Sequence, residues 1–143
     1  MIHGLDTGFL IAMEHSEHDE HVAARTVLAK LSAAGDQFAL APQVVAEFVH
    51  VVTDRRRFVL PMDMPTATLI AQRWWAAHEI VHVFPDDAAT QQFLTWVAHF
   101  FLGRKRLLDT LLAATFQQAG IQSVLTTNPS DFAIFGVFTC ITP

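Results

Sequence analysis

Four acidic residues lie where an apolar segment ends or where a helix is expected to begin. They are Asp6, Glu47, Asp109 and Asp131. A carboxylate among apolar neighbours is costly to bury, and four brought together would repel one another unless a cation neutralised them. Hard cations such as Mg²⁺ and Mn²⁺ take oxygen ligands and often serve phosphate chemistry through a few carboxylates. These residues therefore predict a metal-dependent phosphodiesterase site.

Short apolar runs alternate with helical patterns along the whole chain. Strands are expected at 2–6, 38–41, 80–84, 121–126 and 137–141, and helices at 9–13, 19–34, 42–54, 65–79, 85–101 and 106–119. Gly35, Gly103 and Gly120 are expected to end helices, and residues 128–131 read as a turn. This alternation predicts an α/β fold in which a parallel sheet is covered by helices on both faces.

The expected elements bring the acidic residues to one edge of the sheet. In such folds, ligands bind beyond the carboxyl ends of the strands, where the strand order switches. Asp6 ends the first strand, and Asp131 follows the fourth. Glu47 and Asp109 lie near helix starts that the same edge could share. All four can therefore reach one crevice.

Composition favours one globular domain spanning residues 1–143. The chain is 52% hydrophobic and 16% charged, which excludes intrinsic disorder. No apolar run is long enough to span a membrane, and no signal peptide is expected. The single Cys140 cannot form an internal disulfide, which fits a cytoplasmic location.

The net charge of −5 argues against a passive nucleic-acid binder, but it does not exclude a nuclease whose carboxylates hold metal. The basic residues are grouped, since six of the nine lie in two triplets, at 55–57 and 104–106. Each triplet could contact phosphates or could simply be a solvated loop or helix end.

Three segments, which together cover nearly the whole chain, resemble the PIN-domain family and, within it, the VapC-like toxins of toxin–antitoxin pairs. Residues 5–11, Leu-Asp-Thr-Gly-Phe-Leu-Ile, are similar to the family's opening Asp-Thr and apolar pair. Residues 41–48 are similar to the segment that supplies its glutamate. Residues 108–114, Gly120 and residues 125–132 follow its Asp-containing helix, strand and acidic turn in order and spacing.

The resemblance implies a PIN-like five-stranded parallel sheet of order 3-2-1-4-5 and divalent-metal-dependent cleavage of RNA. It also implies a homodimer and inhibition by a small antitoxin protein. Asp6 and Asp109 would hold Mg²⁺ or Mn²⁺, Glu47 would complete that shell, and Asp131 would bind a second ion or orient a water. Some members have Asp where this chain has Asn128, whereas others use the Asp three residues later, here Asp131.

Substrate contacts are expected from hydroxyl, amide and basic side chains near these carboxylates. Thr7 and Thr126 are candidate partners for a ligand, a water or the phosphate, and Asn128 is a candidate hydrogen-bond donor. The second basic triplet immediately precedes the helix that carries Asp109, so it could hold backbone phosphates. Its members are Arg104, Lys105 and Arg106.

Each acidic residue also has a simpler interpretation. Asp6 and Asp109 could be ordinary structural residues, Asp6 as a helix N-cap. Glu47 could be a surface residue, and Asp131 a turn residue.

Three other functions stay open for the whole chain. They are a PIN nuclease that processes RNA without an antitoxin, a degenerate PIN domain that only binds RNA or protein, and a receiver domain. A receiver needs a phosphorylated Asp ending the third strand, where this chain has Phe84 and Pro85.

Overall fold

The computed structural model describes residues 1–143 and confirms the predicted α/β class. Its five strands are all parallel and follow the order β3-β2-β1-β4-β5, as the family resemblance implied. The strands are β1 (Ile2–Leu5), β2 (Gln37–Leu40), β3 (Ile80–His82), β4 (Ser123–Leu125) and β5 (Thr139–Ile141).

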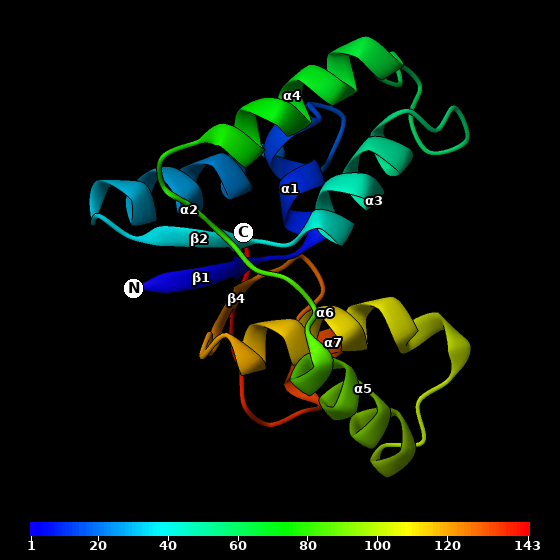
Figure 1. Cartoon of the computed structure of the whole chain (residues 1–143). Helices are drawn as coiled ribbons and strands as arrows, with labels where there is room; N and C mark the ends of the chain where they lie inside the picture. The colour runs from blue at the N-terminus through cyan, green and yellow to red at the C-terminus, as the bar shows by residue number, and fades with distance from the viewer.

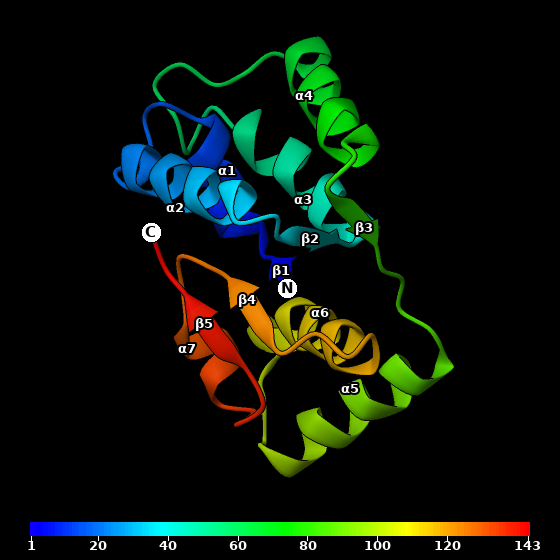
Figure 2. The ribbon, with the colours of Figure 1, turned by 90° about the vertical axis from the view of Figure 1, so that its left-hand side faces the viewer.

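Helices cover the sheet on both faces, so the molecule has three layers (Figures 1 and 2). One layer holds α1 (Thr7–Glu14), α2 (His21–Ala33), α3 (Pro42–Val52) and α4 (Met64–Ala76). The other holds α5 (Asp87–His99), α6 (Leu107–Gln118), α7 (Ser130–Ala133) and a single 3₁₀ turn at Arg104–Arg106. No helix is long and apolar enough to cross a membrane.

The central strands are buried because both of their faces meet helices, as expected for a parallel sheet. Phe38, Leu40, Val124 and Leu125 are fully buried in one continuous core. Gly4 lies in β1 directly over the ring of Phe116 on α6, and a Cβ at this position would come within 2.6 Å of that ring. The missing side chain therefore lets α6 approach the sheet closely.

The ends of three helices show where the sequence pattern was reliable. Gly35 and Gly120 follow α2 and α6 with φ values of +82° and +74°, as predicted. In the third case, α5 ends at His99, two residues before the expected end at Phe101, and the residue that ends it is not Gly103. Phe101 adopts the left-handed conformation there, with φ of 52°, and Leu102 N donates to Val97 O at 3.0 Å. This is the usual glycine-type helix ending with phenylalanine in the glycine position.

The predicted turn after β4 was incomplete, because residues 130–133 form the short helix α7. The register of β1 against β4 pairs Leu5 with Leu125. Both strands therefore end at the same level, and the residues that follow them, Asp6 and Thr126, become neighbours at the carboxyl edge of the sheet.

Candidate active site

Asp6 occupies the junction between β1 and α1 and is 8% exposed. Its Oδ1 accepts a hydrogen bond from Thr7 N at 2.8 Å, so it does cap α1. Its Oδ2 accepts a second bond from the Thr126 hydroxyl, also at 2.8 Å. The predicted capping role is therefore present, but it uses only one of the two carboxylate oxygens, and no cationic side chain pairs with this carboxylate.

Glu47 reaches the same edge from the middle of α3. The Thr7 hydroxyl donates to Glu47 Oε2 at 2.8 Å, which links the start of α1 to α3. The glutamate is otherwise exposed. Thr7 and Thr126 were predicted as partners for a ligand, a water or the phosphate, and in the structure each hydroxyl orients a carboxylate.

Gly8 is adjacent to this junction, and its small size matters there. A Cβ at Gly8 would collide with the Thr127 hydroxyl. The first turn of α1 can therefore lie against the segment after β4 only because residue 8 has no side chain.

Asp109 enters from the first turn of α6, in the opposite helical layer from Glu47. Asp131 follows from α7, and Arg106 holds it from the turn before α6. Arg106 Nη1 lies 3.4 Å from Asp131 Oδ1, and Nη2 donates to the Asp131 backbone carbonyl at 2.7 Å. Asn128 Nδ2 donates to Asp131 Oδ2 at 2.7 Å. Unlike Asp6, Asp131 thus has a cationic partner within the protein.

The electrostatics of Asp6 reflect its position. Burial is the main cause that raises the pKa of Asp6 from its ordinary value of 3.8 to about 7. The hydrogen bond from Thr126 opposes this rise, and the negative charges of Asp109 and Glu47 add to it. The carboxylate lacks a compensating positive charge.

Asp109 shows the same behaviour more weakly. Burial, followed by the charges of Asp131 and Glu47, raises the pKa of Asp109 to about 6. Arg106 works in the opposite direction. Asp109 and Glu47 therefore lie close enough to act on Asp6, and Asp131 and Glu47 close enough to act on Asp109, although the four residues come from the end of β1, α3, α6 and α7.

The donor set suits a hard divalent cation. No three His, Cys, Asp or Glu side chains converge into a ready-made metal cage. Mg²⁺ typically keeps several of its waters and binds through one or two carboxylates, so a full protein cage is not required. Asp6 and Asp109 are carboxylates with raised pKa values, and a cation would relieve the repulsion that contributes to those values.

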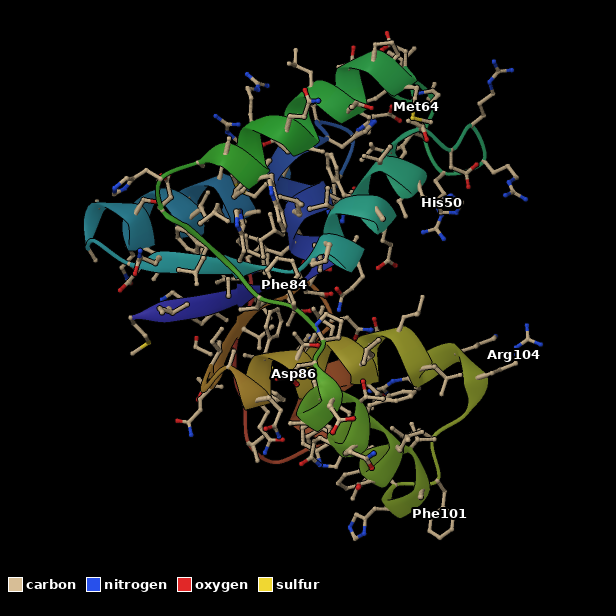
Figure 3. All side chains as sticks on the ribbon, in the orientation of Figure 1. His50, Met64, Phe84, Asp86, Phe101 and Arg104 are labelled. Carbon is tan, nitrogen blue, oxygen red and sulfur yellow. The ribbon has the colours of Figure 1, made fainter.

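The basic triplet before α6 divides into two environments. Arg104 and Lys105 are exposed, and Figure 3 shows Arg104 projecting from the connection between α5 and α6. Arg106 is half-buried against Asp131. The three residues predicted to contact phosphates therefore comprise two free side chains and one that pairs with a site carboxylate.

Sequence reasoning did not anticipate the pairing of Arg106 with Asp131. The two residues are 25 positions apart, so no local spacing could reveal the contact. The local spacing instead pointed to another neighbour, because Arg106 lies three residues, about one helical turn, before Asp109.

A five-stranded parallel sheet of this order, covered by helices on both faces, is the fold that the PIN resemblance implied. The model of the PIN domain family matches residues 5–135, so the chain belongs to the PIN-domain family. Dependence on a divalent metal is general among PIN-domain ribonucleases, so the family and the donor set agree on a cation.

Similar proteins extend this comparison. Ribonuclease VapC24 of Mycobacterium tuberculosis is 27% identical over 139 residues, which cover 92% of this chain and 90% of the relative. The crystal structure of VapC20 from the same species, described as a sarcin-ricin loop cleaving toxin, superimposes with a TM-score of 0.75 at 19% identity over the full length of both chains. A toxin–antitoxin complex from Klebsiella pneumoniae has a TM-score of 0.64 at 18% identity, covering 99% of this chain and 97% of that one.

Proposed function

We propose that this protein is an endoribonuclease that hydrolyses RNA phosphodiester bonds with the help of Mg²⁺ or Mn²⁺, and that it is the toxin of a toxin–antitoxin pair. The observation that supports this most directly is the pair formed by Asp6 and Asp109. Both have raised pKa values and lie beyond the carboxyl edge of a PIN sheet. The ribonuclease relative, similar over nine-tenths of both chains, supports the choice of RNA as substrate.

Asp6 and Asp109 would hold the cation, and Glu47 would complete the shell directly or through a water. A bound divalent cation supplies Lewis-acid polarisation of the phosphate and an activated water. The protein's own part is orientation. Thr126 fixes the Asp6 carboxylate, and Thr7 fixes that of Glu47, so neither has to be ordered when substrate arrives.

Asp131 would play a different part in the reaction. Its carboxylate already accepts a hydrogen bond from Asn128 and lies 3.4 Å from Arg106 Nη1, so it would orient a water or bind a second ion while these groups hold it in place. Asn128 fills the position at which some family members have Asp, and as an amide it adds no charge. We therefore assign the fourth acidic position to Asp131.

The test is cleavage of a mixed panel of tRNA, rRNA fragments and mRNA by purified protein with Mg²⁺, with Mn²⁺ and with chelator. Asp109→Asn is expected to lower the cleavage rate at least about 10³-fold, because a ligand that neutralises transition-state charge is worth several kcal/mol. Asp19→Asn is the matched control, since Asp19 is an exposed acidic residue outside the site. Cleavage that survives both chelator and Asp109→Asn would overturn the proposal.

The toxin assignment adds a partner. The similarity to the toxin–antitoxin complex supports a small cognate antitoxin, and the family supports a homodimer. An RNA substrate and a single free thiol both fit a cytoplasmic protein. Co-expression with the product of a neighbouring gene, followed by light scattering, measures both assemblies. If none of the small proteins encoded by neighbouring genes inhibits RNA cleavage, the result would instead favour a PIN nuclease that acts without an antitoxin.

A further inference from the structure

The first basic triplet has no role in the site described above. Arg55, Arg56 and Arg57 lie in the connection between α3 and α4, which we call the arginine loop (residues 54–60). The side chains of Arg56 and Arg57 are 89% and 62% exposed. Such a dense cluster of charge on a chain with a net charge of −5 calls for an explanation.

The arginine loop is fastened to the rest of the molecule. Glu17, in the connection between α1 and α2, accepts hydrogen bonds from Val59 N at 2.9 Å and from Leu60 N at 2.8 Å. The ring of His15 stacks on Phe58 with centroids 3.8 Å apart. A loop held across 42 residues of sequence presents its arginines at a fixed position and loses little entropy when a ligand binds.

The guanidinium groups remain available for a ligand. Within the guanidinium groups of Arg56 and Arg57, the Asp54 carboxylate contacts the Nε atoms, at 3.3 and 3.8 Å. The terminal Nη groups of both therefore stay free, and these are the groups that bind phosphate oxygens in pairs. Exposed ion pairs of this kind are weak, so a phosphate can compete with Asp54.

The position of the loop relates it to the site. The loop follows the C-terminal end of α3, and Val52 lies only about 8 Å along the helix from Glu47. Figure 3 shows His50 on α3 and Arg104 before α6 on the same side of the molecule, in opposite helical layers. Two of the helices that supply a site carboxylate, α3 with Glu47 and α6 with Asp109, are therefore each joined to an arginine-rich segment.

We propose that the arginine loop binds the phosphates of the RNA strand that passes the carboxylates, a few nucleotides away from the bond that is cut. This inference rests on the proposed ribonuclease function. The site carboxylates repel RNA, so an approaching strand needs cationic contacts outside the site, and phosphate contacts fix its position without reading its sequence. The arginine loop and the exposed pair Arg104 and Lys105 supply such contacts on opposite sides of the site.

The experiment measures binding of a fluorescein-labelled 20-nucleotide RNA by anisotropy between 50 and 200 mM KCl. The protein carries Asp109→Asn so that the probe is not cut. The test variant adds Arg55→Gln and Arg56→Gln. The matched control adds Arg25→Gln and Arg73→Gln, which remove the same charge beside Phe38 and Glu79, at the opposite end of β2 and β3 from the site.

The test variant is expected to bind about tenfold more weakly at 150 mM salt, and the slope of log affinity against log salt should become shallower by about 1.5. The control should stay within about twofold. Equal losses in the two variants would overturn the inference, as would unchanged RNA binding by the test variant, which would leave the loop to a protein partner. Metal-dependent cleavage by the unmodified chain tests the proposed function separately. No RNA binding by the Asp109→Asn protein would overturn the loop's role.

Discussion

The junction of β1 with α1 and the turn between β4 and α7 each bring one aspartate to the site, but they treat its charge in opposite ways. Asp6 is almost fully buried and receives only a hydroxyl and an amide hydrogen bond. Asp131 lies between Asn128 and Arg106. Asn128 Nδ2 donates to Asp131 Oδ2, and Arg106 Nη1 lies 3.4 Å from Oδ1. One region leaves a negative charge uncompensated, whereas the other compensates it with protein groups.

This difference indicates where a cation would contribute most. An ionised carboxylate with a raised pKa destabilises the folded protein, and a bound cation removes that cost. Asp6 offers this gain, whereas Asp131 already has Arg106 as a cationic neighbour. Asp109 lies between these two cases. Burial is the main cause that raises its pKa, the charge of Asp131 raises it further, and Arg106 lowers it. Asp131 and Arg106 therefore adjust how readily Asp109 ionises.

The largest expected effect concerns the stability cost of Asp6. Because its pKa rises from 3.8 to about 7 on folding, the folded state holds a proton that the unfolded state loses. The stability that the protonated Asp6 carboxyl gives the folded state is fully present below pH 3.8 and is lost as the pH rises through 7. Without divalent cations, Asp6→Asn should therefore leave the free energy of unfolding nearly unchanged at pH 4 and raise it by roughly 4 kcal/mol at pH 8.

Urea unfolding at several pH values in chelator measures this difference, and most other titrations cancel because both proteins share them. Glu17→Gln is the control with the opposite sign. Hydrogen bonds from Leu60 N and Val59 N hold the pKa of Glu17 below its ordinary value, so this variant should lose more stability at pH 8 than at pH 4. A lower stability of Asp6→Asn at pH 8 would break the comparison between the two regions.

A second test concerns the influence of the β4–α7 turn on Asp109. Asp131→Asn removes a charge that raises the pKa of Asp109, so the acidic limb of the cleavage rate should move to lower pH. Arg106→Gln removes a charge that lowers this pKa, so the same limb should move to higher pH. Each change is expected to cost roughly tenfold in rate at neutral pH, a typical effect for groups that orient metal ligands.

The readout is the pH dependence of kcat/KM for the two variants and the unmodified protein, with stability measured in parallel. Lys30→Gln serves as the control, because it removes an exposed positive charge on α2, outside the site. If the acidic limbs of the pH profiles of Asp131→Asn and Arg106→Gln move in the same direction, the two variants act through the fold and not through the pKa of Asp109.

The fold was largely predictable because its signals are local. Apolar runs such as Phe38 to Leu40 and glycines such as Gly35 and Gly120 act through their immediate neighbours, and the structure confirms the elements they indicated. The end of α5 was not predictable in this way. Phe101 adopts a conformation that its residue type disfavours. Its side chain is 93% exposed, so the conformation is held by the hydrogen bonds of the finished helix end, such as that from Leu102 N to Val97 O, and not by a local residue preference.

The site was predictable in its residue types but not in its pairings. Strand ends placed Asp6 and Asp131 at one edge, and family resemblance added the strand order. The contacts of Thr7 with Glu47 and of Arg106 with Asp131 join residues 40 and 25 positions apart. Such contacts depend on how the two helical layers close over the sheet, which no spacing in the sequence encodes.

The smallest expected effect comes from making the compensated region resemble the uncompensated one. Asn128→Asp removes the donor to Asp131 Oδ2 and adds a carboxylate beside it. Both groups are at least partly exposed to water, which screens the added charge. Binding of Mn²⁺, measured by calorimetry, should tighten by only a few-fold, and the cleavage rate should change by a similar factor. Ser130→Ala is the control, because it removes only the hydroxyl that donates to Asn128 Oδ1. Weaker Mn²⁺ binding would mean that Asn128 supports the site through its amide hydrogen bond. In that case the compensation of Asp131 would be a requirement of the fold and not an adjustable property of the site.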